Sequence, residues 1–576
     1  MARDDARLNR ASNPPRHDNI VALGPASLVL SGGFEPSITV PKTVVISISP
    51  RELTLYHTSI SEKLKDILKC SLMKSTENKG VFALPEEVVS ASQILKKAGF
   101  EAYLIGGCVR DTLLGRRPND WDLTTNAKPE DIIKIFPKTF YENDYGTVGV
   151  VNESTTDETL KVIEITPYRL ESEYSDKRRP DSVKWSDKLE DDLKRRDFTV
   201  NAIALEVLEE AGKSGTYKGH LVDPYKGQDD LVKKNLQTVG NPHERFSEDA
   251  LRMLRAVRIS TELGFTISVE TTVAIQKYAH LLKEIAMERI REEFVKILMS
   301  ENPMIGIVLS QKLGILQYVT REIEKGIGVE QNQAHSFDVW EHSLRSLQHA
   351  ADKGWPLEIR LAALFHDVAK PETRRFSDET KQWTFYGHEV VGSRETSKIL
   401  TRLAFPKKTV EQVSKLVRWH MFFSDTEQIT PSAVRRLIAK VGQENVWDLM
   451  NLRMCDRIGT GRPKENPYRL RKYKAMVEEV MRDPVSVGML KIDGNKIIDV
   501  THVTPGPKIG YILHALLEEV LEDPKLNEEM FLVKRAIELS GMSEKELKAL
   551  GDKGRDKKEV LEEKNIKEIR NRHHVE

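Results

Sequence analysis

The apolar pattern of this 576-residue chain changes near residue 205. Before that point, one segment with helical spacing, at 85–98, is followed by three short apolar segments typical of strands, at 102–105, 147–151 and 160–166. After it, apolar residues recur almost throughout at the three- and four-residue spacing of amphipathic helices. The pattern predicts an α+β fold in which a small mixed sheet with helices precedes a long all-helical region.

Length and charge limit the classes of protein to which the chain can belong. At roughly 100–200 residues per domain, 576 residues correspond to three to five domains. The 88 basic and 88 acidic side chains balance, which leaves RNA binding open because binding needs a local basic face and not a global excess. The three cysteines lie far apart and predict neither a disulfide framework nor a zinc cluster, which fits a reducing compartment.

Neither the interior of the sequence nor its beginning predicts contact with a membrane. The sequence contains no run of about 18 apolar residues, and Asp4 and Asp5 stand where a secretory signal carries positive charge. We therefore expect a cytoplasmic protein without a membrane partner. An organelle transit peptide is the less favoured alternative.

A glycine pair after the first apolar strand predicts a phosphate-binding turn. Gly106 and Gly107 allow the backbone to approach a ligand closely. Arg110 follows within one helical turn, where it can engage an oxygen of a triphosphate. A lone glycine pair is weak, so this interpretation depends on the residues that follow.

Two carboxylates shortly after the glycine pair predict a metal site. Asp120 and Asp122 are two residues apart, a spacing that puts both carboxylates on one face of a strand. Oxygen ligands of this kind favour hard cations, so we expect two Mg²⁺ ions here. Glu164, flanked by apolar residues, is the candidate third carboxylate from a neighbouring strand. Taken alone, an Asp-x-Asp pair is more often part of a turn or of the surface.

Four further motifs follow the two carboxylates, at 195–202, 223–227, 248–252 and 289–293. Counting the glycine pair with the two carboxylates as the first motif, these are the second to the fifth. Together with the glycine pair and Asp120-Trp121-Asp122, they resemble the signatures of the bacterial-type (class II) tRNA nucleotidyltransferase and poly(A) polymerase family, whose head is of the polymerase-β type. The resemblance spans roughly residues 84–300, and it weakens but continues to about 540.

The resemblance implies an enzyme that adds C, C and A to the 3′ end of tRNA from CTP and ATP, without a nucleic-acid template and with release of pyrophosphate. It also implies contacts between the nucleotide and Arg195, Arg196, Asp197 and Asn201. Relatives that add only CC, only A or a poly(A) tail share these motifs and remain alternatives. The charged stretch at 169–185 resembles the loop that such enzymes use to switch from C to A, and its intact length favours full CCA addition.

The motif at 248–252 has a chemical interpretation of its own. In one predicted helix at 247–263, Asp249 and Arg252 are three residues apart and share a face. An acceptor beside a fork of donors can imitate the edge of a template base, and the resemblance implies that this pair selects CTP or ATP while Glu248 orients the arginine. Spacing alone more often indicates an ordinary intrahelical salt bridge.

Two arginines continue the same predicted helix. Arg255 and Arg258 extend it as a basic stripe, which predicts contacts with phosphates. A solvated helix face is an equal alternative. We include both arginines among the expected nucleotide-binding residues.

A second predicted site combines four histidines and two aspartates: His342, His366, Asp367, His388, His420 and Asp456. The His-Asp pair lies in an apolar helical segment, where ionisable groups are costly unless they are paired or ligated. The order of the six resembles HD-domain phosphohydrolases, which implies one or two metal ions (Ni, Mn, Fe, Zn or Mg) that activate water on a phosphoester. A metal phosphohydrolase acting on RNA ends or phosphoesters is therefore a second alternative function.

These observations divide the chain into six expected parts. They are a poorly ordered N-terminal extension (1–80), the nucleotidyltransferase head (82–220), a helical neck for nucleotide selection and RNA binding (221–305), a helical HD domain (306–480), a C-terminal RNA-binding tail (481–545) and a charged, disordered end (546–576). The expected partners are CTP, ATP and the tRNA acceptor arm, bound by a monomer or a homodimer.

Overall fold

The computed structural model of the protein describes residues 79–550 apart from 142–145, 172–182, 213, 333–334, 423–428, 482–486 and 548–549. Most of the predicted N-terminal extension, most of the charged C-terminal end and the centre of the predicted switching loop lie outside the described residues. Among the described residues, no helix combines the length and apolarity needed to cross a bilayer.

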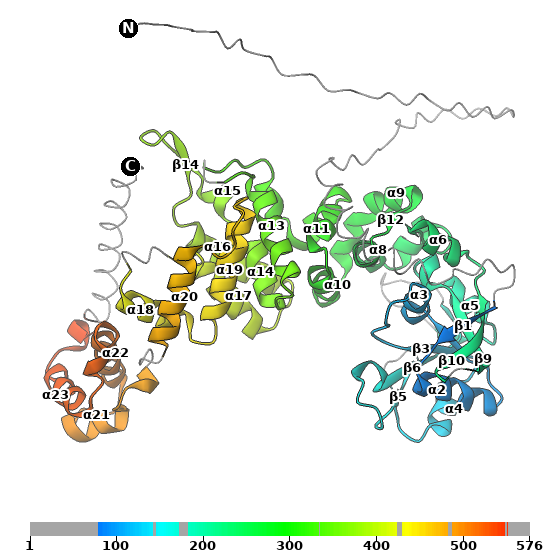
Figure 1. Cartoon of the computed structure of the whole chain (residues 1–576), viewed down its shortest axis with the longest axis horizontal. Coiled ribbons are helices and arrows are strands. Elements are labelled where there is room, and N and C mark those ends of the chain that lie inside the picture. The colour runs from blue at the N-terminus through cyan, green and yellow to red at the C-terminus, as the bar shows by residue number, and fades with distance from the viewer. Residues whose placement is uncertain are drawn as a thin grey trace, which may run out of the picture. The chain divides into compact units, whose positions relative to one another are not determined.

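An eight-stranded mixed sheet forms the head, with strand order β1-β10-β9-β2-β3-β6-β5-β4 (Figure 1). Strands β3 and β6 run parallel, while the other neighbours in this sheet pair antiparallel. The strands are β1 (Lys79–Ala83), β2 (Tyr103–Ile105), β3 (Asp122–Thr125), β4 (Thr139–Tyr141), β5 (Val148–Val151), β6 (Val162–Pro167), β9 (Ala204–Glu210) and β10 (Thr216–Val222). The three strands predicted from the sequence correspond to β2, β5 and β6, and the predicted mixed sheet is confirmed.

The two faces of the sheet have different cores. Leu104, Leu123 and Ile163 point to one face and pack in the main hydrophobic core, which also contains residues of α2 (Glu86–Lys97) and α4 (Pro129–Ile135). The opposite face has a smaller core that is completed by Leu189 and Leu193 of α5. Because successive side chains alternate between faces, Asp122 and Glu164 lie on the α5 side of the sheet.

The remaining short elements of the head are α3 (Gly107–Leu113), α5 (Leu189–Lys194) and a two-stranded ribbon of β7 (Arg169–Glu171) and β8 (Val183–Trp185). The helices that follow the sheet are α6 (Gly227–Lys233), α7 (Pro242–Glu248), α8 (Leu251–Leu263), α9 (Val269–Tyr278), α10 (Met287–Met299), α11 (Pro303–Lys312) and α12 (Leu316–Thr320).

The single helix predicted over 247–263 is wrong. Helix α7 ends at Glu248 and α8 begins at Leu251, while Asp249 has an extended backbone with φ −139° and ψ 104°. The break has a local cause, because Asp249 Oδ1 accepts the Leu251 backbone N–H at 3.0 Å. Short acidic side chains often compete in this way with the helical hydrogen bonds of the backbone.

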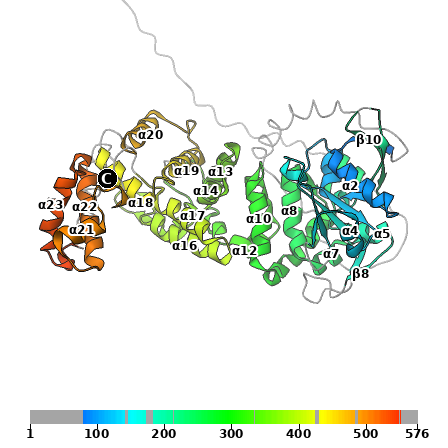
Figure 2. The same cartoon turned by 90° about the horizontal axis from the view of Figure 1, so that it is seen from below.

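A helical body follows, in which α13 packs against α14 and α19, and α16 against α17 (Figure 2). Its helices are α13 (Val339–Asp352), α14 (Leu357–Phe365), α15 (Lys370–Thr373), α16 (His388–Arg402), α17 (Lys407–Trp419), α18 (Pro431–Val441), α19 (Val446–Gly459) and α20 (Tyr468–Val480). A hairpin of β13 (Arg375–Ser377) and β14 (Gln382–Thr384) precedes α16. The C-terminal helices are α21 (Gly494–Thr501), α22 (Pro507–Glu522) and α23 (Glu529–Ser540).

Candidate functional sites

Strand pairing gathers the three predicted carboxylates of the head. The parallel register of β3 and β6 sets Asp122 beside Glu164, and the Glu164 N–H donates to the Trp121 carbonyl at 3.1 Å. Asp120 is exposed in the bend before β3 and is not on the strand as predicted. It still faces the glycine pair, since a Cβ placed on Gly107 would lie 4.0 Å from Asp120 Oδ1.

Gly106 is required by both its conformation and its surroundings. Its φ of +82° lies in the region that side chains rarely adopt. A Cβ at this position would lie 3.0 Å from Arg196 Nη1 and 3.4 Å from Asp122 Oδ2. The glycine therefore lets a guanidinium group and a carboxylate approach the backbone together. This close grouping of opposite charges is the arrangement that a metal–triphosphate complex needs.

The second motif places two arginines on one buried carboxylate. Asp192 accepts from Arg195 Nη2 at 2.6 Å and from Arg196 Nη2 at 3.2 Å. Burial acts to raise the pKa of Asp192, but the two positive charges outweigh it and hold the pKa below its ordinary value. Arg196 Nε is buried without a hydrogen-bond partner among the described residues. The guanidinium nitrogen that reaches Gly106 is Nη1, so this group can meet an anion beside that glycine.

Several residues predicted to bind nucleotide instead form a network that joins the head to α8. Arg110 donates to Asp111 Oδ1 through Nε and to Asn201 Oδ1 through Nη1, both at 2.9 Å. Asn201 Nδ2 donates to Asp197 Oδ1 at 3.2 Å. Asp197 Oδ2 in turn accepts from Arg255 Nε at 2.8 Å. The side chains of this network are therefore held by one another and hold the head against the neck.

The predicted basic stripe on α8 is neutralised within the protein. Besides Asp197, Arg255 faces Glu293 of α10, with Nη1 3.8 Å from Oε1. Arg258 Nε donates to Glu293 Oε2 at 2.7 Å, and its Nη1 lies 3.3 Å from Glu262 Oε2. The i, i+4 spacing in the sequence could have indicated Glu262, but it gave no sign of Asp197 and Glu293, which come from other elements.

The break between α7 and α8 separates the two members of the predicted nucleotide-selecting pair. Arg252 is buried, and its Nη1 donates to Glu248 Oε2 at 2.7 Å, the contact expected for an orienting glutamate. Its Nη2 donates to the Arg195 carbonyl at 3.2 Å. Asp249 binds Arg289 of the fifth motif, with Oδ2 3.0 Å from Nη2. Each member is thus fixed by its own partner, and neither forms a salt bridge with the other.

The third motif builds the turn into α6. Asp223 accepts the N–H groups of Gly227 and Gln228 at 2.8 and 2.9 Å. Gly227 packs directly on the second motif, because a Cβ there would lie 2.2 Å from the Thr199 carbonyl oxygen. The motif at 223–227 therefore positions the motif at 195–202.

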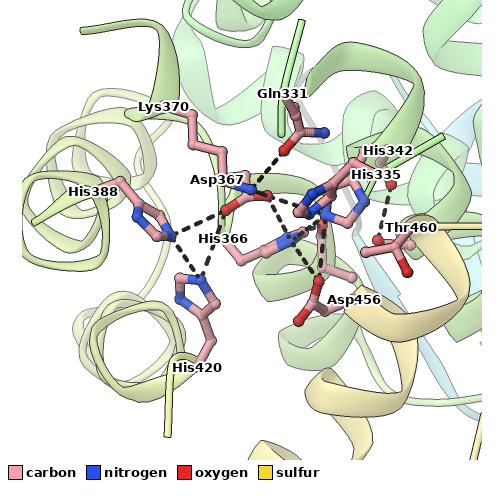
Figure 3. Close-up of polar contacts among 12 residues, drawn as sticks. Gln331, His335, His342, His366, Asp367, Lys370, His388, His420, Asp456 and Thr460 are labelled. Carbon is pink, nitrogen blue, oxygen red and sulfur yellow. Dashed lines mark hydrogen bonds and ion pairs between the residues drawn. The ribbon is translucent and has the colours of Figure 1, made fainter. Parts of the chain in front are cut away.

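The second predicted site is assembled as expected from five helical segments (Figure 3). All six predicted residues are buried around Asp367. Asp367 Oδ2 lies 3.0 Å from His342 Nε2 and 3.2 Å from His366 Nε2. Its Oδ1 lies 3.3 Å from His388 Nε2 and 3.7 Å from His420 Nε2. Asp367 therefore bridges two sets of ligand atoms.

Backbone carbonyls fix the orientation of three imidazoles. The Nδ1 atoms of His366, His388 and His420 lie 2.9, 2.7 and 2.7 Å from the carbonyls of the residues three positions earlier. A neutral imidazole that donates from Nδ1 presents a lone pair on Nε2. Burial, followed by the charges of His388 and His366, lowers the pKa of His420 well below its ordinary value, so this ring is neutral.

With both rings neutral, this orientation leaves the Nε2 acceptors of His388 and His420 facing each other. His388 Nε2 lies 3.2 Å from His420 Nε2, and both point at the Asp367 carboxylate. Lone pairs this close repel unless a cation lies among them. The donor set, buried imidazole nitrogens with carboxylate oxygens, fits a divalent metal ion such as Ni, Mn or Fe. The oxygen-only set of Asp120, Asp122 and Glu164 fits a hard divalent cation in the head.

Sequence reasoning missed three neighbours of the histidine cluster. His335 forms a possible ligand group with His342 and Asp456, but it precedes α13 and no helical spacing relates it to them. Lys370 Nζ lies 2.7 Å from Asp367 Oδ2, a contact that the i, i+3 spacing in the sequence could have indicated. Arg453 pairs with Asp456 at the same helical spacing.

A cleft of about 1070 Å³ opens over the cluster. The cluster contributes Asp367, His388, His420 and Asp456 to its floor, and the β13–β14 hairpin forms part of its wall. The cleft is large enough to hold a nucleotide-sized ligand. The histidine cluster is therefore accessible to a phosphoester through an open cleft.

Three family descriptions match successive parts of the chain. Residues 102–237 match the family described as Poly A polymerase head domain, residues 264–327 the probable RNA and SrmB-binding site of polymerase A, and residues 339–445 the HD domain. A CCA-adding enzyme of Ligilactobacillus salivarius is 32% identical over 79% of this chain and 98% of its own length. A CC-adding tRNA nucleotidyltransferase of Thermus thermophilus is 34% identical over 73% of this chain and 90% of its own length.

A solved structure supports the same relationship. The crystal structure of the Bacillus stearothermophilus CCA-adding enzyme in complex with CTP aligns with a TM-score of 0.58 and 27% identity, covering 79% of this chain and 96% of that one. Nucleotidyltransferase and HD domains both imply the use of divalent metal ions. The chain is thus a nucleotidyltransferase that belongs to the bacterial class II CCA-adding enzyme family.

Proposed function

We propose that this chain adds C, C and A to the 3′ end of tRNA, using CTP and ATP, and does not stop after CC. The observation that carries nucleotide addition is the grouping of Asp120, Asp122 and Arg196 around Gly106 and Gly107, with Glu164 beside Asp122. Relatives named for CCA addition support the full reaction, while the CC-adding relative keeps the shorter reaction as the alternative. A cytoplasmic location stays a prediction.

The carboxylates of the head would hold Mg²⁺, which supplies charge neutralisation and activation of the tRNA 3′-hydroxyl. Arg196 offers its guanidinium group to the triphosphate, and Gly106 keeps the backbone clear of it. The 3′-oxygen forms a bond to the α-phosphorus, and the bond from that phosphorus to the bridging oxygen breaks to release pyrophosphate. The contribution of these residues is to position the reactants and to stabilise charge.

Asp249 and Arg252 remain the candidates for selecting the base. Asp249 supplies the acceptor and is held by Arg289. Arg252 supplies the fork of donors and is held by Glu248. Arg252 Nη2 donates one of its two N–H groups to the Arg195 carbonyl, so reading a base would use another N–H of the guanidinium or exchange this bond for one to the nucleotide. Replacing Arg252 with alanine should then blur the choice of CTP and ATP over UTP and GTP.

The test is a primer-extension assay with Mg²⁺ and three tRNA substrates that lack the end, end in C or end in CC. Growth by three nucleotides that then stops supports the proposal, whereas growth that stops at CC, growth only from CC, or a long A tail assigns one of the alternatives. Asp120→Ala and Asp122→Ala should abolish incorporation. Asp131→Asn, at a half-exposed position of α4 in the same domain, serves as the control.

We infer a second activity, metal-dependent phosphoester hydrolysis, at the histidine cluster. The opposed lone pairs of His388 and His420 carry this inference, since they fit a bound cation under an open cleft. Release of phosphate from a chromogenic phosphomonoester should require Mn²⁺ or Ni²⁺ and be lost in Asp367→Asn. Phosphate release that persists in Asp367→Asn would contradict the assignment. Asp122→Ala, which should abolish nucleotide incorporation, should leave phosphate release unchanged.

A further inference from the structure

One wall of the cleft over the histidine cluster is unusually basic. The segment 453–474 carries eight basic side chains and two acidic ones, in a chain whose net charge is zero. Four of the basic residues, Arg453, Arg457, Arg462 and Arg469, line the cleft. The other four, Lys464, Arg471, Lys472 and Lys474, belong to the same segment but are not among the lining residues. The segment begins on α19 beside the metal-ligand candidate Asp456 and ends on α20.

Neither acidic residue neutralises the outer part of this wall. Asp456 lies in the cluster and pairs with Arg453, and Glu465 is bound by Lys353 at 2.9 Å and by His349 at 3.0 Å. Within the described part of the chain, Arg457 and Arg462 therefore have no carboxylate within salt-bridge distance. Two uncompensated guanidinium groups facing one cleft favour a polyanionic ligand.

The positions of three arginines indicate in which direction a bound polyanion would extend from the histidine cluster. Arg453 and Arg457 are four residues apart on α19, about 6 Å along the helix axis, and Arg462 lies just beyond the end of that helix. All three line the cleft. Positive charge thus extends outward from the cluster.

An aromatic side chain lies on the same wall. Tyr468, the first residue of α20, lines the cleft with 68% of its surface exposed. Across the cleft, Trp383 is already covered by Arg374, whose guanidinium carbon lies 3.7 Å from the ring centre. A basic groove that contains an available aromatic ring is the combination that binds single-stranded nucleic acid, because phosphates follow the charge and bases stack on the ring.

We propose that this cleft binds the phosphorylated end of a single-stranded RNA, with the terminal phosphate at the histidine cluster, the preceding phosphodiesters at Arg457 and Arg462, and a base on Tyr468. The proposal deepens the phosphohydrolase function inferred above and rests on it. A mononucleotide has only the terminal phosphate and leaves both arginines without a ligand. In the reaction, a water oxygen bonds to phosphorus, the ester bond to the ribose oxygen breaks, and that oxygen takes a proton as inorganic phosphate leaves.

The test compares the full chain, loaded with Mn²⁺ or Ni²⁺, on a hexanucleotide with a 3′- or 5′-terminal phosphate and on the matching mononucleotide. We expect kcat/KM for at least one hexanucleotide to exceed that of the mononucleotide by about tenfold or more. In the double variant Arg457→Ser, Arg462→Ser this advantage should disappear. The slope of log kcat/KM against log salt should also become shallower by about 1.4, from about 0.7 per lost phosphate contact on a single strand.

Matched variants separate this effect from a general loss of charge or structure. Arg394→Ser removes an exposed arginine of α16 that does not line the cleft, and it should keep the advantage of the hexanucleotide. Tyr468→Phe should retain most of that advantage, while Tyr468→Ala should lose it because the stacking ring is gone. An equal rate on hexanucleotide and mononucleotide, or on an acidic phosphopeptide, would overturn the proposal.

A binding measurement keeps the two inferences distinguishable. A hexanucleotide carrying 4-thiouridine is cross-linked by light to the full chain, and the attached peptides are identified by mass spectrometry. Attachment within 453–474 supports the RNA site even if no phosphate is released, in which case the hydrolytic function alone fails. Attachment confined to other segments overturns the RNA site, whatever the hydrolytic activity.

Discussion

Replacing Arg255 with leucine tests whether the network between head and neck is structural. The change leaves the buried Asp197 carboxylate without its cation, although the Phe198 N–H at 2.8 Å and Asn201 Nδ2 at 3.2 Å still donate to it. Removing one partner of a buried ion pair costs about 3–5 kcal/mol. Because 35% of the Arg255 side chain is exposed, water screens the pair, and we expect about 2–3 kcal/mol.

The assay is hydrogen exchange of the full chain, followed in peptides from the second motif and from α8. A loss of about 2–3 kcal/mol corresponds to roughly 100-fold faster exchange of amides that open with this contact. Arg394→Leu, at an exposed site of α16, is the control and should change local stability by less than about 0.5 kcal/mol. Asp197→Asn combined with Arg255→Leu should cost less than the two single changes added together, because no charge is then left unpaired.

One result would refute this reasoning. If Arg255→Leu exchanges no faster than the control and instead raises KM for CTP and ATP, then Arg255 contacts nucleotide phosphates, as the basic stripe in the sequence predicts. If the network is structural, amide hydrogen exchange becomes faster in the head and in α8. KM for CTP and ATP then changes only to the extent that the loss of the network displaces the nucleotide site.

Three further outcomes follow from the same contacts. Gly227→Ala places a Cβ 2.2 Å from the Thr199 carbonyl, so thermal unfolding should show a loss of about 1–3 kcal/mol. Gly510→Ala is the control, because nothing lies within 4 Å of its Cβ position and its backbone is not in the positive-φ region. Burial acts to raise the pKa of Asp197, but the charge of Arg255 holds it well below its ordinary value. The resulting stability is present at neutral pH and is lost as pH falls below about 3.9, so urea midpoints measured from pH 5 to pH 2 should fall less steeply in Asp197→Asn. Adding Ni²⁺ or Mn²⁺ to the chelator-treated protein at 100 times its Kd should stabilise the helical body by about 2.7 kcal/mol, and an equal gain in Asp367→Asn would exclude the cluster as the metal site.

Local patterns in the sequence were sufficient for three strands of the sheet and for most of the helices. The histidine cluster was predicted because the order of its ligands along the chain resembles that of HD-domain phosphohydrolases, and the regular apolar spacing placed those ligands on or beside helices. Asp122 and Glu164 were predictable for a similar reason, because each stands in or beside an apolar strand. The break at Asp249 was not, since a side-chain bond to the next turn competes with helix formation without changing the apolar spacing.

The partners of the arginines were beyond the reach of local patterns. Arg255 meets a carboxylate 58 residues away in the chain, and Arg258 meets one 35 residues away. An exposed arginine and a paired one have the same spacing on a helix, so the sequence could not separate a phosphate-binding stripe from a structural contact. His335 was missed for the same reason, as it reaches His342 and Asp456 from a segment outside the helices.

The two metal sites differ in a way that keeps their chemistry apart. The head offers carboxylate oxygens from Asp120, Asp122 and Glu164, a set that prefers hard cations, whereas four of the six predicted ligands in the helical body are imidazoles. A site with nitrogen ligands binds Mn, Fe and Ni more tightly than Mg, and its affinity increases from Mn to Fe to Ni. A site made of carboxylates alone discriminates far less between these ions. Under the proposed functions, Mg²⁺ would serve nucleotide transfer in the head without filling the histidine cluster, and a transition metal would serve hydrolysis without being drawn to the head. One chain would then extend an RNA end at one site and remove a phosphate at the other, each with a different ion.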